Sequence, residues 1–545
     1  MMLSSILLSL LPGVNDLPRA LELIRAGRDH EAHTLIESLA PSPETKFWGL
    51  RARAGAGEIT EALEAADSGE LSAIDADYLR GIAFHGQALA AIAEGNGGMV
   101  EFQFQDAATA LAGAVEVDPA RYADAFLPLT EALWNTQKLE EARAAGEEAA
   151  ERLSKNPRAH HLLGEVCFSQ FVTAKGDEGT QALAAELSAA ATAAFEGAIK
   201  ACDKEIAGHS SMGSKAASKL GDLAVWNEAP DQAASEYAAA VAWDPTQVNY
   251  SQIINSIGNE GLISCLKQGC KAFESRYGAR EAAEATPLWW LGFAQFNEKQ
   301  YADADVTFER VLGLFPAFTN SWWYRAEARF HQSDLDGFLE CVRGLGAYGM
   351  ETLAAQINTD YSRNITVLSG AIKKLNDSGR FLDAAYLCDI RTAANPKSWE
   401  YFDNTALFYR EAACKLMGGP RRTMWKKNAA KLETAHGYFE RSLAAYESAY
   451  ELDPTKPHLL NDKAVVLDYY FNRELDEAER LYKRAVEQAN ALLEDSDSLG
   501  DFERSLAELA QRDGTNNLKL LQRRLEREKK KRERDEKKKK KSEDG

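Results

Sequence analysis

A pattern of seven residues recurs in the chain with identical spacing, and this repetition constrains the fold more than any other feature of the sequence. The positions fall at offsets 0, 1, 4, 13, 17, 20 and 25. The first copy consists of Leu220, Gly221, Ala224, Ala233, Tyr237, Ala240 and Pro245. The second consists of Leu291, Gly292, Gln295, Ala304, Phe308, Val311 and Pro316. Such a repeat predicts a stack of similar units, in place of the roughly three or four separate domains that this length would otherwise suggest.

The second half of the pattern occurs at further places as a small residue, a bulky one, a second small one and a proline. These copies are Ala107, Leu111, Ala114 and Pro119; Ala384, Cys388 and Pro396, with Arg391 at the second small position; Ser442, Tyr446, Ala449 and Pro454; and Ala478, Tyr482 and Ala485 without the proline. Offsets of three, four and seven lie on one face of an α-helix. We therefore expect the small residues to let two antiparallel helices approach closely and the proline to end the second helix.

This pattern resembles the tetratricopeptide repeat (TPR), whose 34-residue unit contains W-x2-L-G-x2-Y, then A-x3-F, then P. The resemblance covers roughly residues 17–490 with gaps. It implies an all-α fold, a right-handed α-solenoid of stacked helical hairpins. It also implies an extended concave surface, which the family uses mainly to bind peptides or proteins.

Gaps in the repeat divide the chain into five expected segments. These are an apolar segment 1–16; irregular TPR-like repeats 17–205; central repeats 206–350; C-terminal repeats 351–495 with an insertion at 414–428; and a charged tail 496–545 that forms either a single helix or a disordered tract. The apolar run at 1–13 lacks the basic residues and the cleavage site of a signal peptide. We expect a first helix and a cytoplasmic protein, with export as the alternative if residues 1–16 act as a signal. No window reaches the length of apolar sequence that a membrane span needs.

Charge is distributed unevenly along the chain. The formal net charge is −20, but the segment from Lys519 onward contains fourteen basic and seven acidic residues, which leaves 49 basic and 76 acidic residues in the first 518. An acidic body repels nucleic acid, so we expect at most weak contact through the Lys-rich tail. A basic island at 415–427 is either a solvated helix start or a contact for an anionic partner. The seven scattered cysteines indicate core residues of a reduced protein.

Motifs for catalysis or metal binding are incomplete. The stretch from Gly208 to Lys215 places a serine where a phosphate-binding loop needs its lysine. His30 and His33 are one residue closer than in a zinc protease motif and have no third ligand in sight, and Cys265 and Cys270 have no partner cluster. We therefore expect no enzyme, no cofactor and no metal, although a site hidden in a degenerate region is an alternative.

The resemblance to TPR proteins places residues of the first helix of each pair on the concave face. By the repeat spacing, the candidate partner-binding residues are His161, Trp289, Phe293, Phe296, Trp323, Glu327 and Phe330. Exposed aromatic residues would bind an apolar peptide segment. The alternative is that Trp289 and Trp323 pack between repeats as core residues. We expect a scaffold or adaptor for a protein or peptide partner, apolar or basic in view of the acidic body; an exported, envelope-associated assembly factor is the other possibility.

Overall fold

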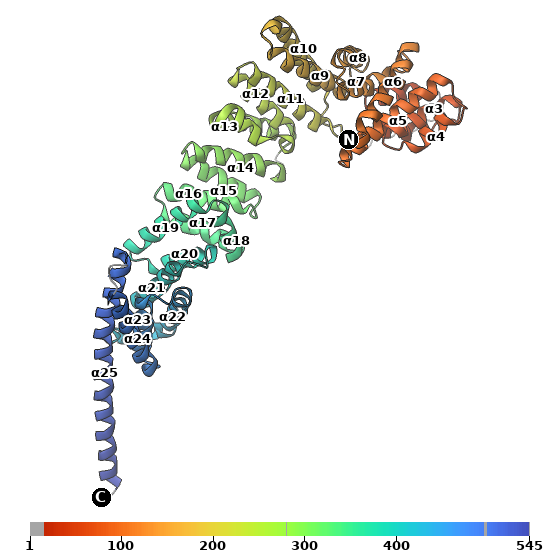
Figure 1. Ribbon diagram of the computed structural model, residues 1–545. Coiled ribbons are helices and arrows are strands. Elements are labelled where there is room, and N and C mark those ends of the chain that lie inside the picture. Colours follow the sequence, from red (N-terminus) through yellow and green to blue (C-terminus); the bar gives the residue numbers. More distant parts are fainter. Residues whose placement is uncertain (1–15, 279–280, 495–498, 544–545) are drawn as a thin grey trace, which may run out of the picture. The chain divides into compact units, whose positions relative to one another are not determined.

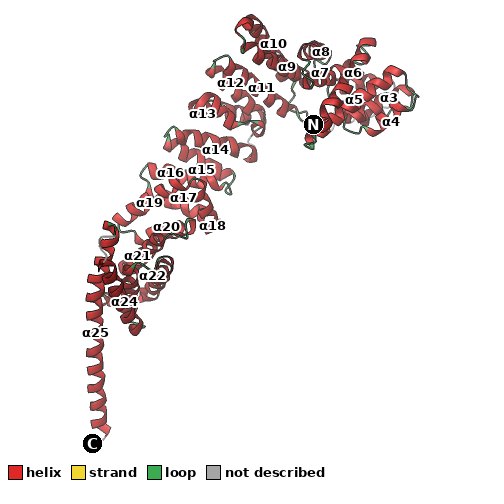
Figure 2. Cartoon of the chain, viewed as in Figure 1, coloured by secondary structure: helices red, strands yellow, loops and turns green. Residues whose placement is uncertain are grey.

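The computed structural model describes residues 16–278, 281–494 and 499–543 of the chain. Figure 2 shows helices and loops throughout these ranges, and no strand occurs in them. The sequence prediction of an all-α fold is confirmed. The segment 1–16, expected to form a first helix or an export signal, lies outside the described residues apart from Asp16.

The chain forms two compact units, residues 1–315 and 316–545, and each is described by itself (Figure 1). The first unit contains α1 (Leu17–Arg25), α2 (Asp29–Glu37), α3 (Pro43–Gly55), α4 (Thr60–Asp67), α5 (Ala73–Ala93), η2 (Gly97–Met99), α6 (Val100–Val117), η3 (Ala123–Ala125), α7 (Phe126–Asn135), α8 (Leu139–Arg152), α9 (Pro157–Lys175), η4 (Glu178–Thr180), α10 (Gln181–Ala201), α11 (His209–Trp226), α12 (Pro230–Trp243), η5 (Pro245–Gln247), α13 (Tyr250–Tyr277), α14 (Glu281–Asn297) and α15 (Tyr301–Leu314).

The second unit begins with the proline that closes the second full copy of the repeat. It contains α16 (Thr319–His331), α17 (Leu335–Gly346), α18 (Met350–Thr359), α19 (Tyr361–Asp377), α20 (Phe381–Ala394), α21 (Trp399–Leu416), η6 (Arg422–Lys431), α22 (Leu432–Leu452), α23 (Pro457–Val465), η7 (Val466–Phe471), α24 (Leu475–Glu494) and α25 (Asp501–Glu543). The boundary between the units falls inside the segment 206–350 that the sequence groups as central repeats, and the finer segment limits stay predictions.

Successive helices pack as hairpins. The pairs are α1 with α2, α3 with α4, α5 with α6, α7 with α8, α9 with α10, α11 with α12, α14 with α15, α16 with α17, α19 with α20, α21 with α22 and α23 with α24. α13 lies between two of these hairpins, and Gly258 interrupts its helical geometry with a φ of 71°.

The second position of the repeat pattern shows why the hairpin requires a glycine there. A Cβ atom added to Gly292 in α14 would lie 2.7 Å from Cε1 of Phe308 in α15. Gly221 in α11 abuts the ring of Tyr237 in α12 in the same way. Both rings are buried, and the alanines at the small positions, such as Ala233, are fully covered. The close approach of the two helices of a pair, which the small residues predict, is confirmed for these two hairpins, and the bulky residue packs on the glycine within its own hairpin.

The prolines end the second helices in the predicted manner. Five helices each stop two residues before a proline, at Val117, Trp243, Leu314, Ala394 and Leu452, ahead of Pro119, Pro245, Pro316, Pro396 and Pro454. The residue between is extended in every case; Asp244, for example, has φ −157° and ψ 99°. A proline ring disfavours helical geometry in the residue before it, so the sequence sets the end of each hairpin.

The insertion and the tail are both helical. In η6, Trp425 is buried, stacks on Phe439 and Tyr470 at 5.7 and 6.1 Å, and donates to the Gly419 carbonyl at 2.9 Å. Trp425 therefore belongs to the core, while the basic residues around it are exposed. The tail is the single helix α25, which packs on α23 and α24 through residues such as Leu521 and then extends beyond them (Figure 1).

One helix of the described chain is long and apolar enough to cross a membrane. It is α10, and its most apolar window has a mean hydropathy of 1.2 and is 33% buried. The expectation that no window reaches this length is corrected, because alanine-rich sequence passes a length and composition test without large apolar side chains. In the structure α10 packs along α9 as the second helix of a hairpin.

Candidate functional site

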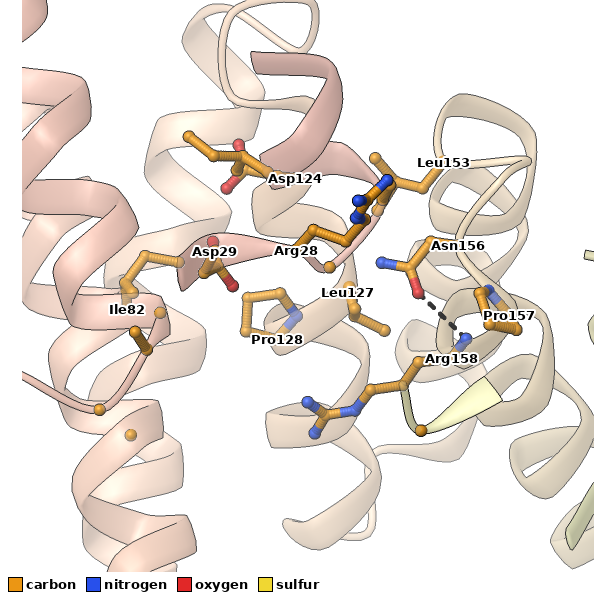
Figure 3. Close-up of a pocket in the computed structure, with 18 of the residues that line it drawn as sticks. Arg28, Asp29, Ile82, Asp124, Leu127, Pro128, Leu153, Asn156, Pro157 and Arg158 are labelled. Atoms are coloured by element: carbon orange, nitrogen blue, oxygen red, sulfur yellow. Dashed lines mark hydrogen bonds between the residues drawn. The ribbon is translucent and has the colours of Figure 1, made fainter. Parts of the chain in front are cut away.

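A cavity of about 460 Å³ lies in the first unit, and we call it the N-terminal cavity (Figure 3). Its wall is formed by residues of α1, α3, α5, α7, α9 and α11, by Asp29 at the start of α2, by Asp124 of η3 and by the loops beside them. The six longer contributors, α1 to α11 in odd numbers, are each the first helix of a hairpin. The first helices of successive hairpins thus face a common space.

Contacts between distant parts of the sequence close this cavity. The Asn156 side chain, at the start of α9, donates to the Arg25 carbonyl at 3.1 Å across 131 residues of sequence. Arg25 in turn donates to the Ala120 carbonyl at 3.2 Å. Asn156 Oδ1 also accepts from the backbone N–H of Arg158 at 3.0 Å, which caps α9 (Figure 3). The first hairpin is thereby held against the start of the fifth.

A buried charge network forms one side of the wall. Arg51 Nε donates to Asp124 Oδ2 at 2.6 Å, and Arg51 Nη1 donates to Asp29 Oδ1 at 3.0 Å. The Tyr78 hydroxyl donates to the same Asp124 oxygen at 2.6 Å. Burial raises the pKa of Asp29, and burial together with the Asp124 charge raises the pKa of Tyr78 well above its usual value. Because buried charges are tolerated only when paired, this network fixes α2, α3, α5 and η3 relative to one another.

A second charge network lies across the cavity between α5, α7 and α9. Glu131 accepts from His85 Nε2 at 2.7 Å and from Arg158 Nη2 at 2.5 Å. Burial disfavours the charged form of Glu131, but the His85 hydrogen bond and the Arg158 charge outweigh it and lower the Glu131 pKa. The Arg158 side chain is 43% exposed, so its guanidinium group remains accessible.

Arg28 forms part of the rim and separates the cavity from a neighbouring hollow of about 690 Å³. The two spaces share Ala26, Arg28, Ile206 and His209. Arg28 pairs with Glu31 and is 34% exposed. Among the described residues that line the second hollow, Lys155, His160 and Lys200 are basic and none is acidic. The rim is therefore polar and partly basic.

The cavity between these networks has apolar lining. Ile82 and Leu89 of α5 and Leu127 and Pro128 of α7 contribute to it. Apolar surface beside a few fixed polar groups is typical of ligand-binding cavities. Among the described residues, no group of three or more His, Cys, Asp or Glu could hold a metal ion, and His33 pairs with Glu37. The arrangement is suited to binding.

The predicted aromatic surface is divided between the two units. In the first unit, Trp289 and Phe293 of α14 stack at 5.3 Å and are half-buried. Phe296 is buried, 5.4 Å from the Tyr301 ring. His161 of α9 is half-buried beside Phe195, and burial lowers its pKa to about 4, so it is neutral at physiological pH. The binding role of these residues stays a prediction.

In the second unit, two of the predicted surface residues lie in the core. Trp323 is 1% exposed, and its indole N–H donates to Asn364 Oδ1 of α19 at 2.9 Å. Glu327 is 2% exposed and accepts from the guanidinium group of Arg363. For Trp323 the alternative of a core position is confirmed, and the expected accessible position of Glu327 is wrong, because α19 covers this side of α16. Phe330 is half-buried, with the Lys374 ammonium 4.3 Å from its ring.

Sequence reasoning missed the residues of the N-terminal cavity. Arg51, Asp124, Asn156 and Arg158 belong to no copy of the repeat pattern, and the contacts between the cavity elements join residues 22 to 131 positions apart. The one sequence signal for these residues is that charged side chains occur within helices that are otherwise apolar. This signal does not indicate which charged side chains contact one another.

No family model matches the chain, and no curated protein matches it. Solved structures that are similar to it include TPR proteins. YrrB, described as a TPR protein with an unusual peptide-binding site, is 16% identical with a TM-score of 0.22 and covers 44% of this chain and 93% of its own. The Cut9–Hcn1 hetero-tetramer of APC/C is 12% identical with a TM-score of 0.24, covering 91% and 96%. Yeast Tom70 is 12% identical with a TM-score of 0.17, covering 78% and 96%.

The chain is a TPR-like helical repeat protein. The spacing of its own repeats and the packing of glycine against aromatic residues within its hairpins establish this description.

Proposed function

We propose that the protein is a non-catalytic scaffold that holds a segment of a partner polypeptide in the N-terminal cavity. The observation that supports this is the convergence of six first helices on one cavity with apolar lining and accessible guanidinium groups at Arg28 and Arg158. In this proposal the cavity is the concave surface that the TPR resemblance implies.

The buried ion pairs give the cavity a preformed shape. Arg51 bridges Asp29 and Asp124, and Asn156 ties α9 to α1, so the wall does not have to be ordered when a partner enters. A rigid receptor loses little conformational entropy on binding, which leaves more of the contact energy as affinity. We propose that an apolar side chain of the partner occupies the lining near Leu127 while its backbone meets the polar rim.

A substitution that fills the cavity tests this proposal. Ala26 ends α1 with a φ of −82°, is half-buried and lines both hollows, so Ala26→Trp places an indole in the proposed binding space without straining the backbone. Ala144→Trp is the matched control, because Ala144 is exposed on α8, a second helix.

The readout is affinity purification from cells of the source organism with quantitative mass spectrometry, after circular dichroism shows that both variants are folded. We expect polypeptides that wild type and Ala144→Trp retain equally and that Ala26→Trp loses by at least about tenfold, the factor that corresponds to about 1.4 kcal/mol. Equal recovery of every polypeptide by Ala26→Trp would contradict the proposal.

A further inference from the structure

A carboxylate without a hydrogen-bond donor lies between α21 and α23 in the second unit. Asp403 of α21 has a side chain that is 27% exposed, and no described residue donates a hydrogen bond to it. The nearest cationic or imidazole group is His458 of α23, whose Nε2 lies 3.9 Å from Asp403 Oδ2. That distance is too long for a hydrogen bond. A carboxylate at this depth normally has a cation or several donors.

The adjacent carboxylate, Asp462, has partners, and these explain why Asp403 has none. Arg410 Nη1 lies 3.6 Å from Asp462 Oδ2, and the Asn461 side chain donates to Asp462 Oδ1 at 3.1 Å. The Tyr446 hydroxyl of α22 also points to Asp462, at 3.5 Å. Arg410, the buried cation of this group, is thus committed to Asp462.

His458 is a second, independent sign of an unfilled site. It is 6% exposed, and neither of its ring nitrogens forms a hydrogen bond with a described residue. Burial lowers its pKa, so the imidazole is neutral and does not compensate the Asp403 charge. The neighbouring Lys456 pairs with Asp453 at 3.6 Å and with Glu503 at 2.9 Å. The Nδ1 atom of His458 is buried without a hydrogen-bond partner, and a buried polar atom of this kind usually has a partner that is missing from the isolated protein.

Electrostatics at this place favour an added cation. Burial and the Asp462 charge raise the pKa of Asp403 to about 7, Arg410 only partly opposes them, and Glu400 adds to the shift. An ammonium or guanidinium group beside Asp403 would return the carboxylate to its charged form.

We propose that Asp403 and His458 form a binding site for the cationic side chain of a lysine or arginine in a partner polypeptide. The side chain donates one hydrogen bond to an Asp403 carboxylate oxygen and a second to an unprotonated nitrogen of His458. The site lies between the first helices of two consecutive hairpins, α21/α22 and α23/α24. It is separate from the N-terminal cavity and does not depend on the function proposed for that cavity.

Fluorescence polarisation with short labelled peptides tests this site on the full chain. The probe is an acetylated and amidated peptide of alternating glycine and lysine, with versions that contain arginine or glutamate at the lysine positions. Asp403→Asn removes the acceptor charge. Glu433→Gln is the matched control, because it removes one negative charge from an exposed position of α22 that forms no ion pair with a described residue.

We expect the lysine or arginine probe to bind wild type and Glu433→Gln equally and to bind Asp403→Asn at least about tenfold more weakly, as found when one partner of a desolvated charge pair is removed. From pH 8 to pH 6 the affinity of wild type should fall about tenfold because Asp403 becomes protonated. Asp403→Asn should show no such fall. The groups facing Asp403 are Glu400, Arg410, His458, Asp462 and Tyr446, and burial lowers the His458 pKa, which opposes protonation of its ring.

Three results would overturn the site. The first is equal binding of the lysine and arginine probes by wild type and Asp403→Asn at pH 8. The second is no binding of either probe by wild type. The third is an equal loss in Glu433→Gln, which would show non-specific attraction to the acidic surface. Ala26→Trp serves to separate the two proposals, because it should leave probe binding unchanged whether or not the N-terminal cavity binds a partner.

Discussion

Gly292→Ala tests the packing rule on which the repeat architecture rests. The added methyl group would lie 2.7 Å from Cε1 and 3.0 Å from Cζ of Phe308, whereas carbon atoms prefer separations of about 3.5–4.0 Å. Phe308 is fully buried, so α14 and α15 must move apart or the ring must leave its rotamer. Overpacking of this kind costs about 1–3 kcal/mol, and the higher helix propensity of alanine returns about 1 kcal/mol. We expect a net loss of up to about 2 kcal/mol.

Gly313→Ala in α15 is the control within the same hairpin. A Cβ atom there meets no atom within 4 Å, so the substitution adds the higher helix propensity of alanine without any overpacking. The variant should therefore be more stable than wild type by up to about 1 kcal/mol. Hydrogen exchange with mass spectrometry, read on peptides from α14 and α15, measures the local opening free energy without assuming that the long array unfolds in one step. If Gly292→Ala protected these peptides as well as Gly313→Ala does, the close-packing explanation of the glycine position would be refuted.

Three further predictions concern buried groups. At pH 8, Asp403→Asn should raise the free energy of unfolding by about 2–4 kcal/mol. The reason is that the pKa of Asp403 is about 7 in the folded protein and about 3.9 in the unfolded chain, so wild type loses stability as the pH rises from 4 to 7. The melting curves of the two proteins should therefore converge below pH 4. Trp323→Ala should lower stability by about 3–5 kcal/mol and half-buried Trp289→Ala by less, measured by hydrogen exchange in α16 and α14. Arg51→Ala should lower the local opening free energy of α3, measured by hydrogen exchange, by about 3–5 kcal/mol, because it leaves Asp124 buried without its cation. The double variant Arg51→Ala/Asp124→Ala should lose less.

The hairpins could be predicted because their determinants are local in sequence. Glycine at the second position and an aromatic residue sixteen positions later meet across one turn, as Gly292 and Phe308 show. Proline acts on its immediate neighbour, so Pro245 is enough to place the end of α12. The proline signal survives in copies that have lost the first half of the pattern, such as those ending at Pro119, Pro396 and Pro454.

The site residues depend on longer-range geometry that a single sequence does not contain. The pattern places Trp323 on the same helical face as Trp289, but α19 supplies Asn364 and covers it. Nothing in the repeat spacing indicates that this helix lies there. The N-terminal cavity likewise depends on how far successive hairpins rotate, since only that rotation brings Asn156 to Arg25. Small angles accumulated over several hairpins decide such contacts.

Photo-crosslinking from the wall of the N-terminal cavity tests the proposed function most directly. With p-benzoylphenylalanine at position 26 in the full chain, irradiated in cells of the source organism, we expect a covalent adduct with a partner polypeptide. The same residue at position 144 on the outside of α8 should not give that adduct. The proposed function would be contradicted if position 26 formed no polypeptide adduct or if both positions gave the same set.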